Sequence, residues 1–161
     1  MTRFDRFLAG VLDQARREAR GDGSSAVEAH HLLLAVAGSD EPGTRRVLGS
    51  VGLDSAAVRE ALNREFERSL AAAGVSLAAA EVPRPSHRRE RPAPLGSSVK
   101  LALERGVRSV ARKRPLLPAH LLLGILLAPV GTVPRALAFA GVDQAALAEL
   151  TRQVLAGDQK G

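Results

Sequence analysis

One stretch of this sequence occurs twice, and this duplication constrains the fold more than any other feature. Residues 31–36 read His-Leu-Leu-Leu-Ala-Val and residues 120–125 read His-Leu-Leu-Leu-Gly-Ile, 89 positions apart. The same offset relates Leu48 to Leu137 and Asp54 to Asp143. Upstream the match continues with a slip of two residues, so that Phe4 corresponds to Leu95. Such a constant spacing indicates two copies of one structural unit, which pack together to bury their apolar faces.

The spacing of apolar residues within each copy predicts four helices and requires no strand. In the first copy, Ser25 with Glu28 three residues later predicts a capping box at the start of the second helix. In the second copy, Pro118 and Pro134 each mark a helix start, where a missing amide costs little. The expected helices cover about 4–20, 26–37, 44–50, 55–72, 97–113, 118 onward, 134 to about 140, and 144–156.

The segment between the two copies differs from both of them in composition. Residues 74–96 contain four prolines and several charges and lose helical periodicity after Ala80, which indicates a linker. We therefore divide the chain into repeat one (4–73), a linker (74–96) and repeat two (97–157) within a single domain spanning 1–161. The expected fold is all-α, with two four-helix repeats related by a pseudo-twofold axis.

Composition narrows the cellular setting. Apolar residues make up 45% of the 161 residues and aromatic residues 2%, so the core must be built from Leu, Val and Ala. The sequence contains no cysteine, which excludes disulfides and thiolate metal ligands. No apolar run approaches the ~18 residues of a membrane span, and residues 1–7 lack the apolar stretch of a signal peptide. These features predict a cytoplasmic protein.

The positive charge of the chain is concentrated in one region. Against a net charge of +6 for the whole chain, residues 84–114 hold ten basic and two acidic residues. A solvated linker and helix face is the simpler interpretation. The alternative is a nucleic-acid surface, since Arg105, Arg108 and Arg112 would share one face of the expected helix. The absence of Tyr and Trp argues against stacking on single strands.

Neither a catalytic nor a metal site is apparent. The serines lie at expected caps and loops, no Gly-x-Ser-x-Gly elbow occurs, and no enzyme activity or cofactor is expected. The adjacent His30 and His31 should diverge by roughly 100° on a helix, which disfavours a shared metal ion. His31 and His120 occupy equivalent places and are interpreted as capping or hydrogen-bonding groups. His30 could face solvent or contact a ligand.

These motifs together resemble one known family. The sequence combines Phe-x3-Ala-x2-Val-Leu-x2-Ala-like helices, His-Leu-Leu-Leu-(Gly/Ala) and a Gly-(Val/Leu)-Asp turn, each of them twice, and in this it is similar to the Clp N-terminal domain. That domain lies at the front of Clp unfoldases, which feed proteins to a compartmental protease. The resemblance covers residues 4–156 and implies a protein-binding domain of chaperone-linked proteolysis and protein quality control.

Two departures from the family pattern affect the expected function. The sequence contains no Gly-x4-Gly-Lys-(Ser/Thr) loop for nucleotide phosphates, so the domain is expected to stand alone without the Clp ATPase. Family members often carry Gly-Thr-Glu before each repeated histidine, and in some of them these glutamates bind phosphorylated arginine. His30 and Ala119 occupy those positions here, and weak phosphoarginine binding is therefore expected.

The resemblance also suggests ligands and contact residues. It implies binding of protein substrates, adaptors, Clp ATPase or protease components, or cyclic-peptide antibiotics, in an accessory, adaptor or decoy role that the sequence does not distinguish. For the apolar residues, simple core packing is the alternative. The competing function is a basic helical protein that binds nucleic acid through residues 84–114. The candidate ligand contacts are Phe4, Leu8, Leu12, His30, Leu95, Lys100 and Glu104.

Overall fold

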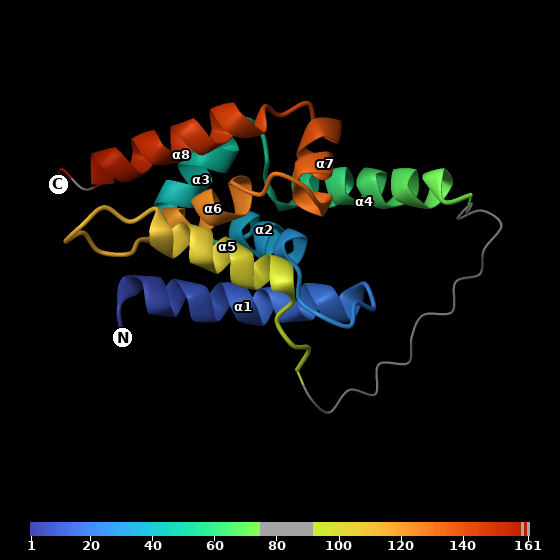
Figure 1. Cartoon of the computed structure of the whole chain (residues 1–161), viewed down its shortest axis with the longest axis horizontal. Helices are drawn as coiled ribbons and strands as arrows, with labels where there is room; N and C mark the ends of the chain where they lie inside the picture. Colours follow the sequence, from blue (N-terminus) through green and yellow to red (C-terminus); the bar gives the residue numbers. More distant parts are fainter. Residues whose placement is uncertain (75–91, 159, 161) are drawn as a thin grey trace.

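The computed structural model describes residues 1–74, 92–158 and 160, and the helices in them number eight (Figure 1). Within these residues there is no strand, only an isolated parallel bridge between Val27 and Leu95. Residues 75–91, most of the expected linker, lie outside the described part of the chain. The helices are α1 (Arg3–Gly21), α2 (Ala29–Ala37), α3 (Pro42–Gly49), α4 (Ser55–Ala72), α5 (Ser97–Arg108), α6 (Pro118–Leu126), α7 (Thr132–Phe139) and α8 (Gln144–Asp158).

Two short helices, α2 and α6, form the centre of the molecule, with α1 and α8 along opposite outer sides (Figure 1). Helices α2 and α6 both carry the repeated His-Leu-Leu-Leu sequence, and every residue of α6 is buried. A helix that is apolar all round can be accommodated only where other helices cover all its faces. The duplicated motif therefore supplies the shared core.

The outer helices of the two repeats are interlocked. Within each repeat the first helix packs on the second, as α1 on α2 and α5 on α6. The fourth helix, however, also packs on the third helix of the other repeat, so that α4 contacts α7 and α8 contacts α3. Each contact between repeats has a counterpart with the roles of the repeats exchanged, as a pseudo-twofold arrangement requires.

The third and seventh helices begin two residues earlier than expected, at Pro42 and Thr132, and two other boundaries differ by more. The second helix begins at Ala29 rather than Ala26, because Glu28 is the N-cap and pairs with His31 instead of with Ser25. The fifth helix ends at Arg108 rather than Lys113, because the Ser109 hydroxyl donates to the Gly106 carbonyl and closes the last turn. Pro134 is the third residue of α7, still within the first turn, where its missing amide is tolerated.

Glycine permits a close approach between α5 and α6. A Cβ on Gly124 would overlap the Ala102 carbonyl oxygen, and one on Gly106 would lie 2.7 Å from the His120 carbonyl oxygen. The equivalent residues in repeat one are Ala35 and Ala15, both buried. Helices α5 and α6 therefore pack more closely than a pair of alanine-lined helices could.

Candidate functional site

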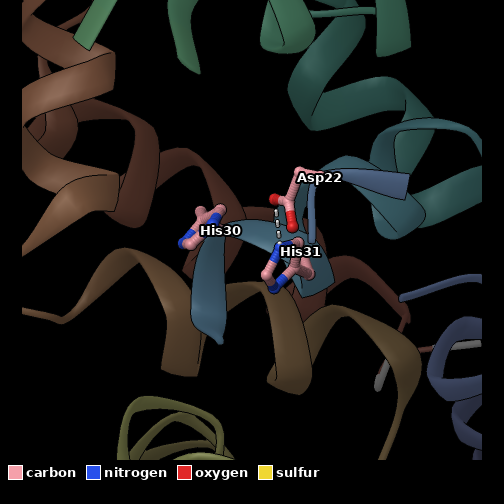
Figure 2. A group of neighbouring side chains, drawn as sticks. All are labelled: Asp22, His30 and His31. Atoms are coloured by element: carbon pink, nitrogen blue, oxygen red, sulfur yellow. Dashed lines mark hydrogen bonds and ion pairs between the residues drawn. The ribbon is translucent and has the colours of Figure 1, made fainter. Parts of the chain in front are cut away.

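His31 connects the start of α2 to the end of α1. Its Nδ1 accepts a hydrogen bond from the Glu28 backbone N–H at 2.9 Å, which places the ring proton on Nε2. Nε2 then donates to Asp22 Oδ2 at 2.7 Å (Figure 2). Partial burial opposes ionisation of Asp22, but hydrogen bonds from His31 and Ser24 outweigh it and lower the pKa of this carboxyl. His31 is thus a buried cap, as the sequence predicted.

Asp22, His30 and His31 lie close enough to be considered as metal ligands. One ligand atom from each residue falls within 4.8 Å of the others, so the expectation that the two histidines diverge was too simple (Figure 2). Both ring nitrogens of His31 are nevertheless engaged. If a metal ion bound to Nε2, the proton of the neutral ring would have to be on Nδ1. It would then face the Glu28 backbone N–H, and the hydrogen bond between them would be lost. The cluster is therefore built as a helix cap rather than as a donor set.

His120 repeats this cap in α6 with one difference. Its Nδ1 accepts from the Leu117 backbone N–H at 2.9 Å, as His31 does from Glu28. Burial lowers the pKa of His120, which favours the neutral ring. Among the described residues no acceptor is hydrogen-bonded to its Nε2, and residues 109–117 contain no carboxylate that could take the place of Asp22.

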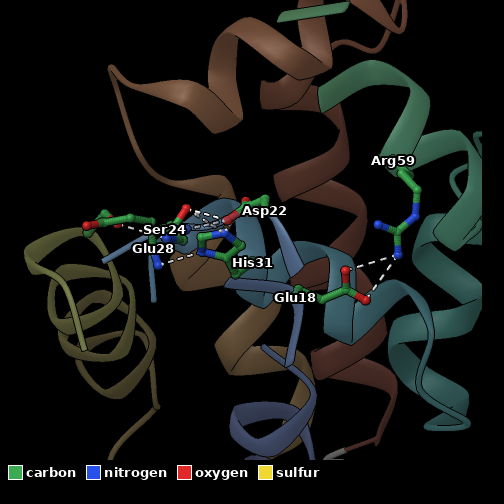
Figure 3. Close-up of polar contacts among 8 residues, drawn as sticks. Glu18, Asp22, Ser24, Glu28, His31 and Arg59 are labelled. Carbon is green, nitrogen blue, oxygen red and sulfur yellow. Dashed lines mark hydrogen bonds and ion pairs between the residues drawn. The ribbon is translucent and has the colours of Figure 1, made fainter. Parts of the chain in front are cut away.

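A groove of about 670 Å³ runs along α1, between α2 and the start of α4. We call it the first-repeat groove. Glu18, a lining residue, accepts two hydrogen bonds from Arg59 across it, at 3.0 and 3.1 Å (Figure 3). Asp40 and Glu41 lie at its other end. Acidic and basic side chains are mixed here, and part of the charge is neutralised internally.

Two hollows flank α5 at the corresponding place in repeat two. The basic hollow, about 510 Å³, lies between α5, α6 and α8. The loop hollow, about 310 Å³, lies between α5, the start of α2 and the loop from α6 to α7, and Arg105 lines both. The loop hollow carries two exposed apolar residues, Leu101 at 46% and Val130 at 80% exposure, as well as His30.

The candidate contacts predicted from the sequence do not converge on one hollow. Phe4 is only 7% exposed and belongs to the core, in agreement with the core-packing alternative. Leu8, Leu12 and Leu95 are partly buried against that core. His30 is the one candidate that lines any of the three hollows described here.

The remaining polar candidates lie on α5. Lys100 and Glu104 are exposed, and Glu104 forms an ion pair with Arg108 at 2.6 Å. Burial, reinforced by the neighbouring His31 ring, lowers the pKa of His30 to about 4, so this side chain is neutral at physiological pH.

Sequence reasoning identified Arg105, Arg108 and His30 but missed other residues that line the hollows of repeat two. Leu101 lies within α5 and Val130 in the loop between α6 and α7, and nothing in their spacing distinguishes them from core residues. Arg152 lies on α8, outside the basic region 84–114, and was not considered. Aligning the two repeats residue by residue, rather than counting charge, would have revealed the change in groove chemistry.

The duplicated His-Leu-Leu-Leu helices, the repeated caps and the interlocked repeats agree with the family match. Residues 3–112 match the family described as the Clp repeat N-terminal domain. This chain belongs to the Clp N-terminal domain family. In Clp chaperones, Clp N-terminal domains are non-catalytic interaction domains that bind substrates and adaptors.

A solved structure shows the same fold over nearly the full length of this chain. It is the N-terminal domain of the caseinolytic protease associated chaperone ClpD from Arabidopsis thaliana, with a TM-score of 0.64 at 22% identity. The match covers 96% of this chain and 97% of that one. No curated protein matches the sequence. None of the described helices is long and apolar enough to cross a membrane.

Proposed function

We propose that this chain is a non-enzymatic binding domain of the cytoplasmic Clp system, which takes up short segments of substrates, adaptors or cyclic peptides. The proposal is supported by the concave surfaces at equivalent places in the two repeats, one groove beside α1 and two hollows beside α5. Small concave sites with apolar walls and a few polar groups are typical of ligand binding. The loop hollow is the stronger apolar candidate because Leu101 and Val130 are exposed beside it.

Within this proposal the sequence candidates have different roles. His30 would contact ligand directly as a neutral, partly buried ring in the loop hollow. Lys100 and Glu104 would contact the polar parts of a bound peptide from the exposed side of α5. Leu8 and Leu12, on α1, and Leu95, just before α5, would contribute from their partly buried positions, while Phe4 would act through the core.

The experiment uses a fluorescein-labelled unfolded protein and fluorescence anisotropy. Leu101→Ser should weaken binding several-fold, because it removes apolar area from the hollow wall. Val107→Ser is the matched control: Val107 is 57% exposed on the same helix and lines none of the three hollows. Equal affinities for the parent and both variants would contradict the proposal, as would ATP or peptide hydrolysis by the purified chain.

Phosphoarginine provides a separate test of specificity. Neither His30 nor Ala119 offers a carboxylate for a guanidinium, so calorimetry with phosphoarginine should show no micromolar binding. The double variant His30→Glu with Ala119→Glu supplies both carboxylates and should bind phosphoarginine more tightly than the parent chain, if the surrounding residues still form the phosphoarginine pocket. Micromolar affinity in the parent chain would refute the assignment.

Nucleic-acid binding is the competing function, supported by the positive charge of residues 84–114. The single basic helix face that it assumed was wrong, because α5 ends at Arg108 and Arg112 lies beyond it. Residues 84–91 of this stretch lie outside the described residues. Duplex binding with a steep salt dependence that persists at physiological salt would favour this alternative.

A further inference from the structure

The basic hollow and the first-repeat groove are equivalent surfaces with different chemistry. When the two repeats are aligned by their sequence offsets, several residues that line the first-repeat groove fall on residues that line the basic hollow. In the first-repeat groove, Glu18 is held by Arg59. In repeat two their places are taken by Ser109 and Ala148, so the ion pair has no counterpart. The matched lining pairs are Gln14 and Arg105, Arg17 and Arg108, Glu18 and Ser109, Leu34 and Leu123, and Gly38 and Leu127.

A second carboxylate is lost at the histidine cap. Asp22 accepts the Nε2 proton of His31, whereas residues 109–117, which precede His120, contain no carboxylate. His120 is a lining residue of the basic hollow, and its Nε2 has no hydrogen-bond partner among the described residues. His120 Nε2 is not among the fully buried atoms left without a partner, so water or a ligand in the hollow can accept its proton.

The remaining charged groups of the hollow are all cationic. Arg105, Arg108 and Arg152 line it, and no aspartate or glutamate does. Arg105 forms no ion pair with any carboxylate in the described part of the chain. Arg108 and Arg152 are paired only with exposed neighbours on their own helices, at 2.6 and 3.4 Å. Such exposed pairs contribute little free energy and can be exchanged for a ligand.

The wall between these cations is apolar. Leu123, Leu127 and Leu155 contribute to the lining. A volume of about 510 Å³ is enough for a few side chains, but the hollow is open rather than enclosed. Apolar walls with a cationic rim match a peptide that carries both aliphatic and acidic groups.

We propose that the basic hollow binds an oxyanion carried by a peptide, either a carboxylate or a phosphate ester, with Arg105 and His120 Nε2 as its central donors. Guanidinium groups donate to both oxyanions in bidentate geometry. The proposal rests on the proposed function for the peptide nature of the ligand. To the proposed function it adds the chemical class of the ligand, an oxyanion, and the surface that binds it. None of the candidate ligand contacts predicted from the sequence lines this surface.

The test measures anisotropy of a fluorescein-labelled peptide of leucine, glycine and aspartate at low salt. Matched peptides carry asparagine or phosphoserine in place of aspartate, and each is made with a free and an amidated C-terminus. We expect the asparagine peptide with an amidated C-terminus to bind at least tenfold more weakly than the aspartate peptide, as the loss of one charge-assisted contact implies. The phosphoserine peptide and the free C-terminus identify which oxyanion is preferred.

Two substitutions restore the chemistry of repeat one. Arg105→Gln and Ser109→Glu each introduce the residue found in the first-repeat groove and should weaken acidic-peptide binding about tenfold or more. Arg64→Gln is the control: it makes the same charge change as Arg105→Gln on α4, at a residue that lines none of the hollows. Equal weakening by Arg64→Gln and Arg105→Gln would overturn the proposal, because it would show an effect of net charge alone.

The remaining outcomes separate this inference from the proposed function. If the unfolded-protein probe binds and responds to Leu101→Ser while the aspartate and asparagine peptides bind equally, the oxyanion site is refuted and the binding function stands. If neither probe binds, both are refuted. Tighter, Arg105-dependent binding of a DNA oligonucleotide of the same charge as the peptide would also overturn the peptide assignment.

Discussion

The histidines of this chain differ in role although two of them are neighbours. His31 and His120 cap helices through Nδ1, whereas His30 is held neutral by burial. The sequence predicted the capping roles from the duplication alone, since equivalent positions have equivalent surroundings. It could not predict how Asp22, nine residues before His31, would fold back onto it, because the loop between them has no regular spacing.

The low pKa of His30 predicts a pH dependence of stability. In the unfolded chain His30 titrates near 6.5, but in the folded protein near 4, so the unfolded state takes up its proton first as the pH falls. The free energy of unfolding should therefore decrease between pH 6.5 and 4, by on the order of 3 kcal/mol from this residue. Urea denaturation across this range measures the decrease.

His30→Gln is the matched variant for this prediction. It removes the titrating group and should flatten the slope between pH 6.5 and 4, leaving the smaller contribution of His120, whose pKa is also lowered. A variant whose unfolding free energy changes with pH as steeply as that of the parent would contradict the assignment.

Helix pairing within a repeat depends on side-chain size at one contact. Gly124 lets α6 approach the backbone of α5, and Gly106 does the same from the other helix. In the sequence this difference is visible only as Gly in place of Ala within the duplicated motif. The sequences of the two repeats therefore predict the same helices. They do not predict that α5 and α6 pack more closely, because this depends on how near the backbone of the partner helix lies.

Gly124→Ala should destabilise the protein by about 3 kcal/mol or more, because its Cβ would meet the Ala102 carbonyl and the helices would have to separate. Gly10→Ala is the comparison: Gly10 is an exposed residue within α1 whose Cβ would meet nothing within 4 Å. That change should raise the unfolding free energy by about 0.5–1 kcal/mol. Similar melting temperatures for the two variants would show that the close approach is not a constraint.

At the scale of the whole molecule, the repeats hold each other through their third and fourth helices. Glu65 of α4 is 5% exposed, accepts a hydrogen bond from Ser69 and pairs with Arg135 of α7 at 2.9 Å. The all-α architecture, with eight helices in the described residues, followed from the duplication and the spacing of apolar residues. The exchange of partners between repeats did not, because amphipathic faces do not specify which helix covers them.

Removing Arg135 tests this contact. Arg135→Ala leaves the buried Glu65 carboxylate with a hydroxyl partner alone and should lower the unfolding free energy by about 1–3 kcal/mol. Arg46→Ala is the matched control, since Arg46 is the equivalent residue of α3 and the place of Glu65 is taken by Val154. Thermal unfolding should separate the two variants, and equal losses would refute a specific role for the ion pair.

The interlocked helices also determine when the fold can form during protein synthesis. Glu65 must wait for Arg135, 70 residues later in the chain, before its charge is paired. Helix α3 contacts α2 and α6, but its most extensive contacts are with α8, the last helix to be made. The first repeat therefore leaves the ribosome with apolar faces uncovered, and it reaches its final packing only when nearly the entire chain has been translated.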